Sequence, residues 1–99
     1  MKKQNLAFLA YDVDYDEDIT NLLSSGIVSG FTKWDRVLGA GQKSDPKMDT
    51  PVWPGYNCLV MIILSKENEI NFKKEISEFI NKHNGAGIKL FILPLLEVI

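Results

Sequence analysis

Three short apolar segments limit most strongly what this chain can fold into. Leu6–Tyr11, Cys58–Leu64 and Ile88–Leu93 are apolar at almost every position, and each is too short to stand as an independent helix. Continuous apolar runs of this length are typical of strands that are covered on both faces. Any fold for this chain must therefore provide cover for both sides of three strands.

The segment after the first strand is predicted to be a short helix. An acidic run from Asp12 to Asp18 precedes Ile19, Leu22 and Leu23, which recur at helical spacing. Asp14 and Glu17 are spaced like a capping box. Gly26 stands where a glycine commonly ends a helix.

A second, longer helix is predicted from Lys66 to Asn84, before Gly85. It is amphipathic, because apolar residues recur at helical spacing between lysines and glutamates: Ile70, Ile76, Phe79 and Ile80. His83, near its C-terminus, suits a cation beside the negative end of the helix dipole.

Between the first helix and the second apolar strand lie a further strand and a long loop. Residues 27–38 alternate in the manner of an edge strand with one wet side. Residues 39–54 have no period and are rich in turn-forming residues. Loops of this length inside a compact domain are commonly functional or flexible.

The resulting order is strand, helix, strand, loop, strand, helix, strand, which predicts one domain over residues 1–99. It is the α+β, ferredoxin-like βαββαβ arrangement, an antiparallel sheet with both helices on one face. The other face would then expose about three large apolar residues on each of three strands, at a cost on the order of 10–20 kcal/mol of forgone burial. We therefore expect copies of the chain to pack these faces together in a homo-oligomer. The alternative is that the C-terminal tail or the long loop of the same chain covers this face of the sheet.

Composition excludes several classes of protein. The formal net charge is −2 and Arg36 is the only arginine, so no basic surface for nucleic acid is expected. A single cysteine excludes an intrachain disulfide. The N-terminus lacks the pattern of a signal peptide or a membrane span, so we expect a cytoplasmic protein.

Candidate catalytic and metal-binding chemistry is weak along the whole sequence. An EF-hand that began at Asp12 would place Glu17 and Leu23 where glycine and glutamate are needed, so no calcium site is expected. Cys58 is read as a small core residue and His83 as a helix-terminal cation. Without a visible nucleophile and base pair, we expect no enzyme.

Two glycine-containing segments could instead approach an anion through backbone amides. One is 39–43, Gly-Ala-Gly-Gln-Lys, and the other is 84–89, Asn-Gly-Ala-Gly-Ile-Lys. The first is neither a phosphate-binding loop nor a dinucleotide fingerprint, because it follows a strand but opens no helix. Taken alone, the first is most simply a flexible loop base and the second a helix stop followed by a turn.

The order of these motifs resembles the PII signalling proteins and their PII-like relatives. The resemblance runs from about Asn21 to Ile99 and is carried by Gly-Ile-Val-Ser-Gly-Phe-Thr at 26–32, Gly-Ala-Gly-Gln at 39–42, Gly55, and Lys-Leu-Phe-Ile at 89–92. It implies a ferredoxin-like homotrimer whose sheets face inward. It also implies a small effector, an adenine nucleotide or another small anion, in clefts between subunits. The segment 39–54 would be the T-loop that engages a membrane transporter or regulatory protein.

The resemblance also assigns residues. It implies a ligand-binding set of Thr32, Gly39, Gly41, Gln42, Gly87 and Lys89, with Lys89 in the loop before the last strand. Lys43 and Trp53 would lie in the partner-binding loop. Trp53 occupies about the position of a modifiable tyrosine, so uridylylation is not expected there. The other function considered is a metal-responsive trimer similar to the CutA divalent-ion-tolerance proteins, although one cysteine, one histidine and three methionines supply few soft ligands.

Overall fold

A computed structural model describes residues 3–42, 45–85 and 87–99. In chain order the elements are β1 (Gln4–Asp12), the 3-10 turn η1 (Val13–Tyr15), α1 (Asp16–Leu23), β2 (Thr32–Val37), β3 (Asn57–Ser65), α2 (Lys66–Lys82) and β4 (Ile88–Pro94). The three apolar segments are β1, β3 and β4, as the sequence predicts.

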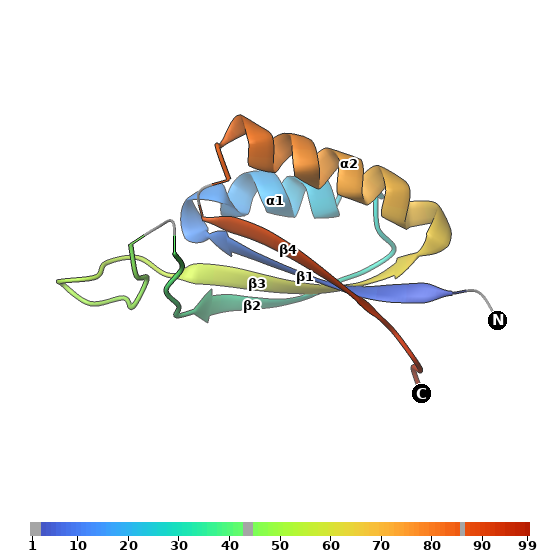
Figure 1. Ribbon diagram of the computed structural model, residues 1–99, viewed down its shortest axis with the longest axis horizontal. Coiled ribbons are helices and arrows are strands. Elements are labelled where there is room, and N and C mark those ends of the chain that lie inside the picture. The colour runs from blue at the N-terminus through green and yellow to red at the C-terminus, as the bar shows by residue number, and fades with distance from the viewer. Residues whose placement is uncertain (1–2, 43–44, 86) are drawn as a thin grey trace.

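The described strands form one sheet in the order β2-β3-β1-β4, with every neighbouring pair antiparallel. Both described helices lie on the same face of this sheet (Figure 1). The predicted ferredoxin-like α+β fold is therefore confirmed. The last strand lies beside the first because each strand–helix–strand half crosses back over the sheet.

The core lies between the helices and the sheet. Along β1 and β3 every second side chain is buried, as the two-residue period of a strand requires. The helices contribute Ile19 and Leu23 from α1 and Phe72 and Ile76 from α2. Ile70, predicted to lie on the apolar side of the second helix, is instead 76% exposed.

The helix ends differ from the predictions in two places. The capping box of Asp14 and Glu17 is wrong, because the side chain of Asp12 accepts a hydrogen bond from the Asp14 amide and begins η1. Helix α1 then starts at Asp16, and the side chain of its N-cap residue, Tyr15, makes no capping hydrogen bond. Helix α2 ends at Lys82 and is capped at its start by Ser65. The predicted strand over 27–38 shortens to β2.

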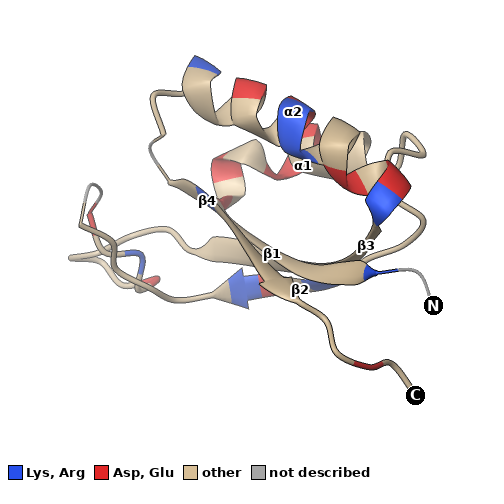
Figure 2. Cartoon of the chain, turned by 45° about the vertical axis from the view of Figure 1, so that its right-hand side comes forward, with Lys and Arg blue, Asp and Glu red and all other residues tan. Residues whose placement is uncertain are grey.

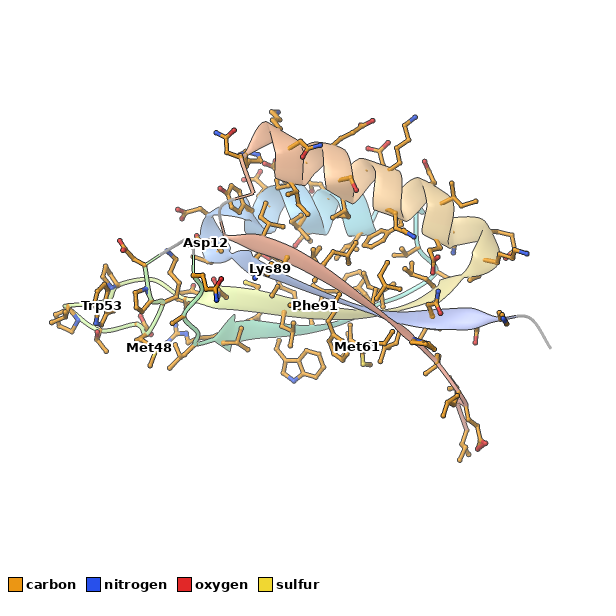
Figure 3. The ribbon with its side chains drawn as sticks, in the orientation of Figure 1. Asp12, Met48, Trp53, Met61, Lys89 and Phe91 are labelled. Carbon is orange, nitrogen blue, oxygen red and sulfur yellow. The ribbon has the colours of Figure 1, made fainter. Side chains whose placement is uncertain are left out.

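The face of the sheet turned away from the helices is the second main feature of the fold. We call it the open face; it comprises Leu6, Phe8, Ala10, Thr32, Trp34, Leu59, Met61, Ile63, Lys89, Phe91 and Leu93. The strand register places these residues in rows, for example Thr32–Met61–Phe8–Phe91. Figure 3 shows Met61 on this side. Trp34, Phe91 and Leu93 are between 44% and 50% exposed.

The rest of the described chain leaves the open face uncovered. After Leu95, whose amide donates to the Gln4 carbonyl at 3.3 Å, the C-terminal tail departs from the sheet (Figure 1). Its Leu96 is 93% exposed. The described part of the loop between β2 and β3 projects beyond one end of the sheet (Figure 1). The predicted apolar face is therefore present and is not roofed by its own tail.

Candidate functional site

The predicted ligand-binding residues gather, with one exception, at one end of the sheet. There β1 and β2 end while β3 and β4 begin, because all neighbouring strands run antiparallel. Gly39 follows β2 by two residues, and Gly87 immediately precedes β4. The Asp12 amide donates to the Gly87 carbonyl at 2.8 Å, and Asp12 pairs with Asn57 across the sheet. The loop base and the turn before β4 thus meet around Asp12.

Gly87 is required at its position by both backbone and packing. Its φ is +72°, in the left-handed region that favours glycine. A Cβ there would lie 3.3 Å from the Cβ of Asp12 and 3.7 Å from the ring of Tyr15. The turn before β4 therefore lies close against the end of β1.

Lys89 lies in the predicted last strand and not in the preceding loop, where the resemblance places it. It is the second residue of β4 rather than part of the preceding loop, because β4 pairs with β1 from Ile88 onward. Its partner is Ala10, so its side chain belongs to the open face. The row is Trp34–Leu59–Ala10–Lys89, which places one ammonium group beside an apolar surface. Figure 3 labels Lys89 near the start of β4.

The loop after β2 folds back on its own base. Gly39 and Lys47 exchange two backbone hydrogen bonds, of 2.9 and 2.7 Å. The Lys47 ammonium lies 3.4 Å from the Asp12 carboxylate, and Arg36 pairs with Asp49 at 3.0 Å. Gly41 and Gln42 lie exposed between Gly39 and the residues outside the described set, which include the predicted partner contact Lys43.

The far end of this loop exposes apolar side chains. Trp53 is 42% exposed, and Met48 and Val52 beside it in the chain are also exposed (Figure 3). The Trp53 carbonyl accepts hydrogen bonds from the Met48 and Thr50 amides, which closes the tip. The Trp53 side chain therefore stays partly exposed at this end of the loop.

Thr32 is the exception among the predicted ligand contacts. It begins β2 and pairs with Met61 near the middle of β3. Strand β2 lies at one edge of the sheet and β4 at the other, so three strand spacings, at least about 14 Å, separate Thr32 from Lys89. A small ligand that contacts both residues has to draw them from different copies of the chain.

Sequence reasoning missed three polar residues at this end of the sheet. Asn57 pairs with Asp12, and its Nδ2 lies 3.7 Å from where a Cβ of Gly39 would stand. Lys47 reaches Asp12 from the loop. On sequence alone, the acidic run that contains Asp12 indicates only capping and a solvated surface. The antiparallel strand order could have identified Asp12, because it places the end of β1 beside the start of β4.

A second polar cluster lies where α1 meets β2. The Tyr11 hydroxyl donates to Asp16 at 2.7 Å, and the Lys33 ammonium lies 2.8 Å from the same carboxylate. Burial alone would raise the pKa of Asp16, yet the hydrogen bonds from Lys33 and Tyr11 outweigh it and hold that pKa below its ordinary value. Burial, reinforced by Asp16, raises the pKa of Tyr11. These pairs anchor α1 to the edge strand.

Cys58 and His83 are both packed by the fold. Burial raises the pKa of the Cys58 thiol, which donates to the Asp35 carbonyl at 3.3 Å. The His83 ring lies against Tyr15 and Phe79, with ring centroids 4.7 and 4.5 Å away. Its Nε2 is buried without a hydrogen-bond partner among the described atoms. Within the described ranges, no three His, Cys, Asp or Glu side chains are grouped to hold a metal ion.

The helix side of the molecule contains a shallow hollow of about 380 Å³. It is lined by residues from the end of α1, the following turn and α2: Leu22, Ser25, Gly26, Ile27, Asn71 and Glu75. It lies on the opposite side of the sheet from Lys89. It therefore does not coincide with the residues that the resemblance assigns.

Comparison with known proteins supports the fold assignment. No protein-family model and no curated protein matches the sequence. Among solved structures, a PII-like signalling protein from Thermus thermophilus matches with a TM-score of 0.70 at 14% identity, over 98% of this chain and 91% of that one. The chain has the PII-like fold.

Two further solved structures share the PII-like fold. CPII, a nitrogen regulatory PII-like protein from Thiomonas intermedia K12, was solved bound to ADP and bicarbonate. It matches with a TM-score of 0.71 at 14% identity, over 96% of this chain and 87% of that one. A DUF3240 family protein from Shewanella baltica OS155 gives 0.68 at 15% identity, over 99% and 96%.

The described helices can also be compared with the length of a membrane span. None of them combines the length and the apolar composition needed to cross a bilayer.

Proposed function

We propose that this chain is a non-enzymatic PII-like regulatory protein of the cytoplasm. Three copies pack their open faces together and bind a small anionic effector, an adenine nucleotide or a simple anion, at the boundaries between copies. The loop over residues 39–54 then acts as a flexible, T-loop-like arm of the single domain. Through Trp53 and Lys43 it contacts a partner protein, either a membrane transporter or a regulatory protein.

The open face supports the assembly. Its apolar side chains are half-buried or exposed in a single chain. Figure 2 shows that charged residues are spread along α2, whereas β3 carries none. Complete burial of one large apolar side chain contributes about 1.5–3 kcal/mol. A contiguous apolar surface of this kind marks an interaction site in a soluble protein. A second and third copy present an identical apolar surface, so they are the simplest cover.

Lys89 is the single observation that carries the ligand proposal. It lies on the open face in the same row as Leu59 and Ala10, so covering that face removes water from around its ammonium group. An unpaired buried charge costs several kcal/mol. An anion at the boundary between copies would neutralise it. The absence of a side chain at Gly41 and Gly87 would let backbone amides approach the same anion, whereas the Gly39 amide already donates to the Lys47 carbonyl.

The solved neighbours make particular ligands worth testing first. CPII was solved with ADP and bicarbonate. ADP and bicarbonate would satisfy the same requirement for negative charge beside Lys89. Thr32 from the edge strand of a second copy would complete the contacts that one chain cannot supply.

The test is a titration of the purified protein with ADP, ATP, bicarbonate and 2-oxoglutarate. Binding is measured by calorimetry and by the temperature of thermal unfolding. Binding should raise the unfolding temperature by mass action. Lys89→Ala should lower the affinity for ADP at least tenfold without changing the oligomeric state. Lys82→Ala, at the end of α2, is the matched control and should leave binding unchanged.

A parallel titration with divalent metal ions separates the two candidate functions. Stabilisation by metals alone would favour the CutA-like alternative. No response to any anion would contradict the effector proposal. Equal affinity of the wild type and Lys89→Ala for ADP would remove Lys89 from the site.

A further inference from the structure

One ion pair joins the candidate ligand site to the loop. The Lys47 ammonium lies 3.4 Å from Asp12 Oδ2, and the two side chains are 22% and 16% exposed. This pair is more buried than another ion pair of the loop, Arg36 with Asp49, whose side chains are 62% and 41% exposed. The Asp12–Lys47 contact is thus the better shielded of the two.

Asp12 is held firmly, so it provides a fixed carboxylate. Its amide donates to the Gly87 carbonyl at 2.8 Å, and its Oδ1 accepts from the Asp14 amide at 2.8 Å. Oδ2 is the oxygen that lies beside Lys47. Asp12 is two residues after Ala10, the partner of Lys89, so it lies on the same face of the sheet at the next register position beside the proposed anion site.

A carboxylate beside an anion site is unfavourable unless a cation compensates it. Lys47 supplies that cation, and its long flexible side chain can also reach an anion that is bound nearby. An incoming phosphate or carbonate would therefore compete with Asp12 for the same ammonium group. Both side chains keep some exposure, and the Nζ–Oδ2 distance is 3.4 Å, so an anion that reaches the ammonium group can take the place of the carboxylate.

We propose that Lys47 is a second cationic contact of the ligand site, and that Asp12 holds it while the site is empty. Anion binding transfers the Lys47 ammonium from the Asp12 carboxylate to the ligand. Because the backbone of Lys47 is bonded to Gly39 at the base of the loop, this exchange alters the path of the loop. The inference rests on the proposed effector site, and it names the link between that site and the loop.

The test uses ADP as the probe and measures affinity by calorimetry for the full-length protein. Lys47→Met keeps most of the side-chain length and removes the charge. It should lower the affinity for ADP about tenfold. Asp12→Asn keeps the oxygen that caps η1 and removes the competing charge. Asp12→Asn should raise the affinity for ADP about threefold to fivefold. Arg36→Gln breaks the more exposed ion pair and should leave affinity unchanged.

The double variant D12N/K47M gives the decisive comparison. If Asp12 acts by holding Lys47, the gain from Asp12→Asn should shrink in the Lys47→Met background. Hydrogen exchange of peptides from residues 39–54 should change when ADP binds to the wild type. The same change should be present without ADP in Asp12→Asn.

The outcomes separate this inference from the proposal on which it rests. If the wild type binds ADP but Lys47→Met and Asp12→Asn match it in affinity and loop exchange, the role of Lys47 is wrong and the effector site stands. If the gain from Asp12→Asn persists fully in the double variant, simple repulsion by Asp12 replaces the exchange of partners. If the wild type binds none of ADP, ATP, bicarbonate and 2-oxoglutarate, both proposals fail.

Discussion

Asp16 joins the first helix to the edge of the sheet through one carboxylate. It accepts from the Tyr11 hydroxyl at 2.7 Å and pairs with Lys33 at 2.8 Å. Its pKa is raised by burial but lowered further by the hydrogen bonds from Lys33 and Tyr11, so the net change is downward. A carboxyl whose pKa is lower in the folded state stabilises the fold above its unfolded pKa. That contribution disappears as the pH falls through the folded pKa.

The free energy of unfolding should therefore fall below about pH 4. Asp16→Asn should be less stable than the wild type at pH 7, and the difference should shrink as the pH approaches 2. Urea unfolding at a series of pH values measures this. Asp18→Asn changes an exposed acid in the first turn of the same helix and should retain the wild-type pH dependence. An unchanged slope in Asp16→Asn would show that the carboxylate contributes no pH-dependent stability.

At the scale of elements, the turn between α2 and β4 is set by close packing. Gly87 has φ +72° and lies against Asp12, whereas Gly26 has φ +93° and a Cβ added to it would meet nothing within 4 Å. Gly26→Ala should cost about 1–2 kcal/mol from backbone strain alone. Gly87→Ala should cost more, because its Cβ also meets Asp12. Chemical denaturation compares the two variants directly, and equal losses would mean that the contact with Asp12 relaxes freely.

The strands were predictable from the sequence, whereas several element ends were not. Continuous apolar runs predicted β1, β3 and β4 because one side of each packs on helices and the other forms the open face. The capping box failed because Asp12, the last residue of β1, competes for the Asp14 amide. Ile70 has helical spacing but lies on the outer side of α2, where local periodicity alone does not distinguish it from Phe72.

The candidate site was predictable only in part, for a reason of geometry. Glycine motifs located Gly39 and Gly87, which do lie at the same end of the sheet. The resemblance placed Lys89 in a loop, whereas the apolar run Ile88–Leu93 placed it in a strand; its pairing with Ala10 confirms the strand and puts Lys89 on the open face. No sequence pattern predicted a role for Lys47, because that role depends on a contact with Asp12, 35 positions earlier in the chain. Such a contact is visible only after the loop has folded back.

At the scale of the whole molecule, the open face determines whether the chain works alone. Met61 lies in the central row between Thr32 and Phe8 and is turned away from the helices (Figure 3). In the assembly that we propose it would be buried, where a charge is costly. In a single chain a lysine at the same position can extend its ammonium into water. Met61→Lys should therefore prevent assembly without preventing folding.

Light scattering of the wild type should give about 34 kDa, three copies of an 11.2 kDa chain. Met61→Lys should give the mass of one chain, with its helical circular dichroism retained. Ile70→Lys is the matched control, because Ile70 is 76% exposed on α2, and it should assemble like the wild type. A wild type that is monodisperse at the mass of one chain would mean that the open face has another cover. The boundary site at Lys89 would then lack the neighbour that removes it from water, and the proposed effector would lose its physical basis.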